Sequence, residues 1–136
     1  RSRLVGNFLG MRLMHSGYTV YVQGEISTPS IREGDLLIVI SGSGETTQLV
    51  SFANKAKSEN AKVVLICSKS SSTIGDIADK TIQIGTDNSF APTKGMPMGT
   101  MFELSTLIFL EAIVSHLIHE KGIPEEEMKY RHANME

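Results

Sequence analysis

The chain has 136 residues, of which 40% are hydrophobic, and a formal net charge of −2. This composition predicts a single domain over residues 1–136 and argues against a nucleic-acid partner, because no excess of basic charge is present. The one cysteine, Cys67, excludes an internal disulfide framework and a multi-cysteine metal site. With no signal-peptide pattern and no uncharged run of 18 apolar residues, the sequence favours a cytoplasmic protein without a membrane partner.

The first part of the chain alternates between helical and β-rich segments. Apolar residues at helical spacing predict a helix over 4–17, and the segment 18–24 predicts a strand. After a polar connection, the continuous apolar run 35–41 is typical of a strand buried on both faces. The segment 45–60 is predicted to be helical, and 61–68 is predicted to be a second doubly buried strand.

The second part contains the longest predicted helix, over residues 98–122. A short helix over 72–80 and a weak strand over 81–85 precede it. The composition of 86–97 predicts a loop, and the segment 123–136 is a polar tail. Strands that alternate with helices predict an α/β fold: a parallel sheet of four strands with helices on both faces, in three layers. Such sheets bind ligands at the carboxyl ends of their strands.

The stretch "SGSGETT", residues 41–47, falls at one of these carboxyl ends, just before a predicted helix. A helix N-terminus attracts anions, glycines allow close approach of the backbone, and hydroxyl groups add neutral donors. A phosphate site fits this pattern better than a plain helix cap, which needs only one hydroxyl. Nucleotide motifs do not fit, since a GK[ST] ending is missing and a G-x-G-x-x-G pattern breaks at Thr47. The predicted phosphate-binding residues here are Ser41, Gly42, Ser43, Gly44 and Thr46.

Two other segments resemble this turn in character. The loop 68–73 carries several serines and a threonine after the next strand, and a solvated loop rich in helix caps explains it as well as a ligand site does. Ser2 stands just before the first predicted helix, in the corresponding place for a strand that the chain lacks. We expect these segments to converge with the 41–47 turn around a small polyhydroxylated phosphate.

The motif "SGSGET" after an apolar strand, with a serine-rich loop one strand later, resembles the sugar isomerase (SIS) domain family. The segments "MPMGTMFELSTLIFLEAIV" and "RHANME" are similar to the 6-phospho-3-hexuloisomerase branch of that family, and the resemblance covers the whole chain. In the family a helix, a strand and a glycine-rich turn precede the position of Arg1. The resemblance therefore implies an N-terminally incomplete SIS domain whose first strand is missing.

The resemblance implies interconversion of D-arabino-hex-3-ulose 6-phosphate and D-fructose 6-phosphate through an enediol. This reaction needs a base that moves one proton between adjacent carbons, and it needs no metal or cofactor. Another phosphosugar isomerase, of the arabinose 5-phosphate or sedoheptulose 7-phosphate type, is an alternative because phosphate loops do not report carbon number. A noncatalytic sugar-phosphate sensor is the other alternative, although such sensors usually carry a DNA-binding domain and none is visible in the sequence.

Glu103 is the predicted base, because it interrupts an apolar helix and falls in the family's catalytic glutamate motif; burial there would raise its pKa. An exposed first-turn glutamate that complements the helix dipole is the alternative reading. Glu111, two turns later, is expected to pair with a lysine or arginine. His132 is the second catalytic candidate, as the resemblance implies, in its own or a neighbouring subunit; by sequence alone it would be a solvated tail histidine.

Other histidines and the longest helix suggest structural roles. His15 is expected to be structural at the end of the first helix, and His116 and His119 have no evident third metal ligand. The apolar positions of 98–122 wrap around more than one helix face, whereas a surface helix would show one stripe. We therefore expect a homo-oligomer, either a homodimer or a homotetramer, in which this helix is covered.

Overall fold

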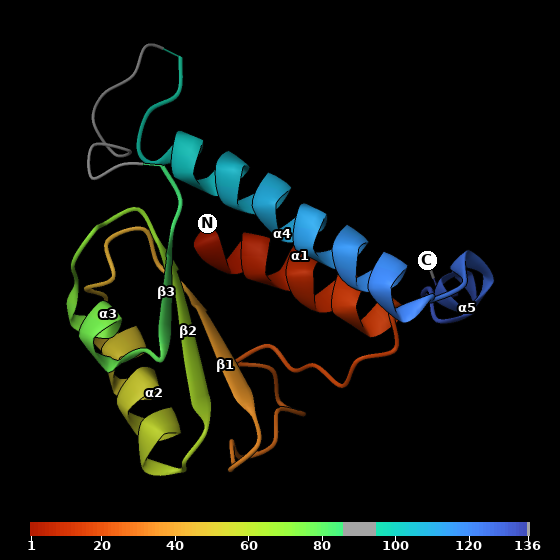
Figure 1. Ribbon diagram of the computed structural model, residues 1–136, viewed down its shortest axis with the longest axis horizontal. Helices are drawn as coiled ribbons and strands as arrows, with labels where there is room; N and C mark the ends of the chain where they lie inside the picture. The colour runs from red at the N-terminus through yellow and green to blue at the C-terminus, as the bar shows by residue number, and fades with distance from the viewer. Residues whose placement is uncertain (86–94, 136) are drawn as a thin grey trace. The chain divides into compact units, whose positions relative to one another are not determined.

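The computed structural model describes residues 1–85 and 95–135. The chain divides into two compact units. Unit 1 comprises Arg1, Arg3–Pro29 and Leu107–Glu136, and unit 2 comprises Ser2 and Ser30–Thr106. The helices are α1 (Ser2–His15), α2 (Thr47–Ser58), α3 (Thr73–Ile77), α4 (Thr100–Lys121) and α5 (Glu125–Tyr130), and the strands are β1 (Leu36–Ile40), β2 (Lys62–Cys67) and β3 (Lys80–Gln83) (Figure 1).

Unit 2 is built on a parallel sheet in the order β1-β2-β3, with α2 and α3 packed against it (Figure 1). The residues of α2 that face the sheet include the small Ala53 and Ala56, both fully buried. Their size allows α2 to approach the sheet closely. This arrangement confirms the predicted α/β class with a parallel sheet. The core between sheet and helices consists of Val39, Ala53, Ala56, Ala61, Val63, Leu65, Cys67 and Ile74.

Two strand predictions require correction. Residues 18–24 form no strand; their backbone turns locally, with the Glu25 N–H donating to the Val22 oxygen at 3.1 Å. A strand requires a neighbouring ladder, and no strand pairs with this segment in the described part of the chain, so three strands stand where four were predicted. The strand β1 was predicted to be buried on both faces, yet it lies at an edge of the described sheet, with Leu36 55% and Ile38 36% exposed.

Unit 1 contains most of α1, the connection that follows it, α5 and the part of α4 from Leu107 onward. Within it, α1 and α4 lie side by side (Figure 1). The Arg12 guanidinium donates two hydrogen bonds to the Glu111 carboxylate, from Nε to Oε2 at 3.1 Å and from Nη2 to Oε1 at 2.8 Å. This bidentate pair joins the two helices and confirms the expected pairing of Glu111 with a basic residue.

The ends of α4 follow the predicted helix 98–122 closely, whereas α5 lies inside the segment predicted to be only a polar tail. Pro124 at the N-cap and three glutamates in the first turn of α5 are a recognisable helix start, so the sequence did carry this signal. Of the predicted loop 86–97, residues 86–94 lie outside the described part. The helix α4 is long and apolar enough to cross a membrane by length and composition, with a mean hydropathy of 1.6.

Asp79 ties the amino-terminal end of β2 to α2 within unit 2. Its carboxylate accepts hydrogen bonds from Lys57 Nζ and from the Val63 N–H, both at 2.8 Å, and Lys62 Nζ lies 3.5 Å away. The hydrogen bond from Lys57, followed by that from Val63, lowers the pKa of Asp79 to about 2. Since a free aspartate titrates near pH ~3.9, the folded state prefers the ionised form.

Asp79→Asn is therefore expected to lower the free energy of unfolding at pH 7. The extra free energy of unfolding of the wild type is fully present above the unfolded-state pKa of Asp79. It is lost as the pH falls through about 2. Urea unfolding of both proteins at several pH values between 7 and 2 checks this. Lys57→Met, which removes the largest cause of the shift, should reproduce part of the loss. A difference between wild type and Asp79→Asn that stays constant down to pH 2 would contradict the prediction.

Candidate functional site

The 41–47 turn begins where β1 ends, and its first hydroxyl is used inside the turn. The Ser41 N–H donates to the Ile66 oxygen at 3.0 Å and so continues the pairing of β1 with β2. The Ser41 side chain is buried, and its oxygen accepts a hydrogen bond from the Gly44 N–H at 3.2 Å. Ser41 therefore shapes the turn, and its predicted direct contact with a phosphate remains a prediction.

The other hydroxyls of the turn lie at the surface, at the N-terminus of α2. Ser43 is exposed and its oxygen accepts the Glu45 N–H at 3.2 Å. Thr46 is the exposed N-cap residue, and within the described chain its side chain makes no capping hydrogen bond. The plain-cap alternative required such a bond. The first N–H groups of a helix have no intrahelical acceptor, so an exposed start of this kind can receive an anion.

The 68–73 loop uses several of its hydroxyls for structure. Ser68 is fully buried, and both its N–H and its hydroxyl donate to the Gly42 oxygen, at 3.0 and 2.8 Å. Ser72 caps α3 by accepting the Gly75 N–H at 3.1 Å. The contact of Ser72 supports the cap-rich interpretation, whereas Ser68 is a buried link between the loop and the turn and caps no helix. A pocket of about 120 Å³ opens beside this loop, lined by Lys69, Ser70, Ser71, Ser72, Gly75, Asp76 and Thr81.

Gly44 is required at the point where the turn meets the loop. Its φ of +69° lies in the left-handed region, and a Cβ built there would stand 2.3 Å from the Ser72 Oγ. The Gly44 oxygen also accepts the Ile74 N–H at 3.1 Å. The close approach of the turn to α3 therefore depends on the missing side chain at residue 44.

Glu45 is a site residue that the sequence interpretation missed. Its carboxylate accepts hydrogen bonds from the Thr73 N–H at 2.8 Å and from the Thr73 hydroxyl at 2.6 Å. The Thr73 hydroxyl, followed by the Thr73 N–H, holds the pKa of Glu45 below its ordinary value. An acid beside a helix start could have been noticed, but its partner lies 28 residues away and only the fold brings it there.

Glu103 belongs to the same compact unit as both hydroxyl-rich segments and lies in the first turn of α4. Its N–H donates to the Gly99 oxygen at 3.1 Å, and the residue is partly buried. One turn later Thr106 is fully buried, and its hydroxyl has no hydrogen-bond partner among residues 1–85 and 95–135. A threonine inside an apolar helix was visible in the sequence but was not singled out. Two apolar neighbours of Glu103 in this helix, Met101 and Leu104, are 43% and 48% exposed.

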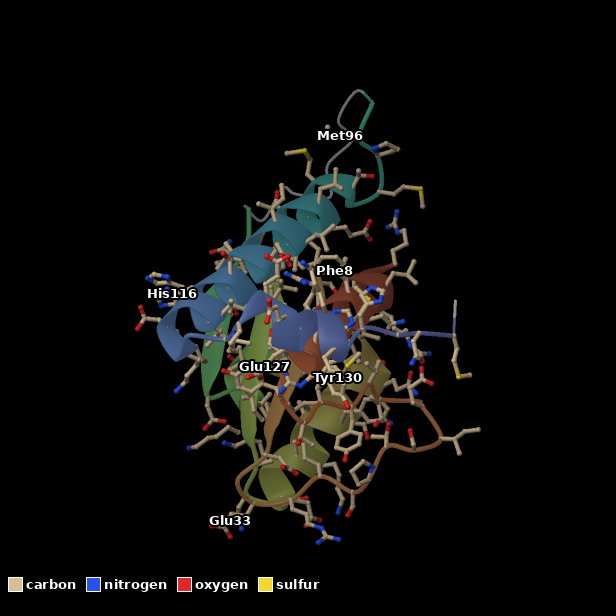
Figure 2. The ribbon with its side chains drawn as sticks, turned by 90° about the vertical axis from the view of Figure 1, so that its right-hand side faces the viewer. Phe8, Glu33, Met96, His116, Glu127 and Tyr130 are labelled. Carbon is tan, nitrogen blue, oxygen red and sulfur yellow. The ribbon has the colours of Figure 1, made fainter. Side chains whose placement is uncertain are left out.

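His132 lies in unit 1, after α5, and is exposed, although its ring contacts another histidine. Its ring stacks on that of the buried His15, with 5.0 Å between ring centroids and 26° between planes. The neighbouring Arg131 reinforces this contact, because its Nη1 donates to the His15 oxygen at 3.4 Å. His15 is the last residue of α1, the place expected from the sequence, and its structural role stays a prediction. His116, by contrast, is exposed and projects outward from α4 (Figure 2).

Ser2 does not occupy a loop, as the sequence had suggested. It is the first residue of α1, with Arg1 at the N-cap position. The N–H groups of Leu4 and Val5 both bond to the Arg1 oxygen, at 2.9 and 3.4 Å, so helical bonding already includes residue 1. Ser2 is thus placed in the first turn of a helix, and its phosphate contact stays a prediction.

Comparison with known proteins agrees with this arrangement. The SIS domain model matches residues 1–109. A 3-hexulose-6-phosphate isomerase of Methylomonas aminofaciens is 51% identical over 138 residues, covering 100% of this chain and 76% of that protein. A Bacillus subtilis (strain 168) protein of the same name is 41% identical over 140 residues, with 100% and 76% covered.

A solved structure from Methanococcus jannaschii, from which a molecular function of 3-hexulose-6-phosphate isomerase was inferred, superposes with a TM-score of 0.90. It is 37% identical, and the match covers 99% of this chain and 73% of that one. Sequence and fold similarity thus extend together over nearly the whole described chain. With the hydroxyl-rich turn between β1 and α2 in the position that the family motif requires, the chain belongs to the SIS domain family, in its 3-hexulose-6-phosphate isomerase branch.

Proposed function

We propose that the chain interconverts D-arabino-hex-3-ulose 6-phosphate and D-fructose 6-phosphate, the activity named in its relatives. The observation that carries the proposal is the exposed N-terminus of α2, where Thr46 leaves the helix start without a side-chain cap within the described chain. Ser43 presents a second exposed hydroxyl there. Hydrogen-bond donors and the positive end of the helix dipole lie together here. Both favour binding of the phosphate group of a phosphosugar.

In the proposed reaction the open-chain ketose is held by its phosphate at the 41–47 turn. Glu103 takes a proton from the carbon next to the carbonyl, which produces an enediol spanning C2 and C3, and returns a proton to the other carbon. His132 serves as a proton donor to the substrate oxygen or in ring opening, because histidine is the commonest general acid and base in enzymes. Proton transfer between adjacent carbons requires no cofactor, since no net oxidation occurs.

We further propose that the protein is a cytoplasmic homodimer or homotetramer in which α4 is covered by a neighbouring copy. Only 22% of the apolar window of α4 is buried within the described chain, and Ile108 is 71% exposed. A surface that apolar is unusual for a monomer in water. Light scattering during size-exclusion chromatography should give the mass of two or four chains, and a monomer at micromolar concentration would reject the assembly.

An assay with fructose 6-phosphate tests the activity directly. Formation of the 3-hexulose 6-phosphate should exceed turnover of arabinose 5-phosphate and sedoheptulose 7-phosphate by at least about 100-fold in kcat/KM, the discrimination expected when substrate hydroxyl groups meet fitted polar partners. Preference for one of those two sugars would favour the alternative isomerases. Binding of phosphosugars without turnover of any would favour the sensor.

A further inference from the structure

We propose that Glu45 is a positioning residue that locks the phosphate-binding turn onto the 68–73 loop, an inference that rests on the proposed function. The two segments meet through backbone contacts at Gly42 and Gly44, which lie four and two residues before the N-cap of α2. Glu45 is the last residue before the N-cap Thr46. Its side chain therefore fixes the turn at the point where the proposed phosphate contacts begin.

The geometry around Glu45 fixes the turn from two directions. Its backbone N–H donates to the Ser43 oxygen at 3.2 Å, which orients one of the exposed hydroxyls. Both of its carboxylate oxygens are engaged by Thr73, through the N–H at 2.8 Å and the hydroxyl at 2.6 Å. A carboxylate that accepts two hydrogen bonds from one residue has little rotational freedom, so the turn and the first residue of α3 move together.

The same contacts also determine where the negative charge of Glu45 lies. A carboxylate next to an anion-binding helix start would repel a phosphate if its charge faced that start. In this structure the carboxylate oxygens are directed to Thr73, whose N–H and hydroxyl both donate to them and stabilise the negative charge. The hydrogen bonds from Thr73 also keep the group ionised, which the lowered pKa of Glu45 reflects. Glu45 thus acts through geometry and not by touching the substrate.

The test compares Glu45→Ala, Glu45→Gln and Thr73→Val. Glu45→Ala should raise KM for fructose 6-phosphate about tenfold, with kcat within about twofold, because loss of both hydrogen bonds to Thr73 loosens the turn and weakens ground-state and transition-state binding alike. Glu45→Gln should stay within about threefold of the wild-type KM, since its amide can accept the Thr73 N–H and donate to the Thr73 hydroxyl. The double variant Glu45→Ala/Thr73→Val should be no worse than Glu45→Ala alone.

Asp79→Asn is the matched control, because Asp79 is also a carboxylate with two strong bonds in unit 2 but lies before β3, away from the turn. It should lower Tm and leave KM unchanged. An unchanged KM in Glu45→Ala overturns the inference. Equal damage in Glu45→Gln and Glu45→Ala also overturns it, because the charge itself would then act. If the wild type turns over no phosphosugar, the proposed function fails. The role of Glu45 is then still decided by comparing the affinities of the same variants for inorganic phosphate, measured by calorimetry.

Discussion

Replacing Glu103 with glutamine is expected to lower kcat roughly 10³-fold, within the range that general base catalysis supplies. Glutamine keeps the size and hydrogen-bonding capacity of the side chain but cannot take a proton from carbon. Affinity for a nonreacting phosphosugar analogue should remain within about threefold, because the proposed phosphate contacts lie in the 41–47 turn. Steady-state turnover and calorimetric binding of the analogue measure the two quantities separately.

Glu111→Gln is the matched control on the same helix. Glu111 is held by Arg12 in a bidentate ion pair, so its replacement should cost stability and leave kcat close to that of the wild type. A loss of less than tenfold in Glu103→Gln would remove Glu103 from the mechanism. An equal loss in both variants would indicate damage to α4 rather than removal of a base.

The Glu103→Gln subunit also tests where His132 acts. Mixing it with inactive His132→Ala subunits, under conditions in which chains exchange, should restore part of the activity if a site takes one residue from each of two chains. Every site would retain a defect if both residues came from the same chain. With subunit exchange verified independently, the absence of any recovery would reject the shared site and leave the isomerase proposal intact.

Replacing Gly44 with alanine is expected to lower the free energy of unfolding by about 3 kcal/mol, through left-handed strain and overpacking together. The added Cβ would stand 2.3 Å from the Ser72 Oγ and 2.5 Å from the Ser72 Cβ, closer than real contacts allow. Since Ser72 is buried and caps α3, the turn itself must move, and phosphate affinity should fall at least about tenfold. Thermal unfolding should show Tm lower by roughly 10 °C.

Gly34→Ala is a control that separates the backbone strain of a positive φ from the steric clash of the added Cβ. Gly34 also has a positive φ, +91°, but an added Cβ would meet nothing within 4 Å. This variant should therefore lose only about 1 kcal/mol and keep wild-type phosphate affinity. Adding Ser72→Gly to Gly44→Ala removes the colliding atoms and should recover part of the lost affinity. Equal losses in Gly34→Ala and Gly44→Ala would refute the steric explanation.

The local features of the sequence were sufficient to place the elements of unit 2 and the helix α4, most of which belongs to unit 1. Apolar runs and helical spacing indicated β1, α2, β2 and α4, because these patterns report on burial within one segment. The glycines and hydroxyls of the 41–47 turn likewise indicated a special helix start. The prediction of a strand over 18–24 was wrong. The alternation of side chains in this segment is typical of a strand, but a strand forms only beside a neighbouring strand, which the local pattern cannot specify.

The sequence by itself determined the α/β class, the position of the hydroxyl-rich turn between β1 and α2, and the SIS resemblance, since each depends on residues close together in the chain. Only the tertiary structure decided how the hydroxyls are used. It buried Ser41 in a hydrogen bond within the turn, buried Ser68 in a contact between the loop and the turn, left Thr46 exposed, and brought Glu45 to Thr73. The roles of Ser68 and Glu45 depend on hydrogen bonds between residues 26 and 28 positions apart, whose partners are brought together by parallel strand pairing and not by any local pattern.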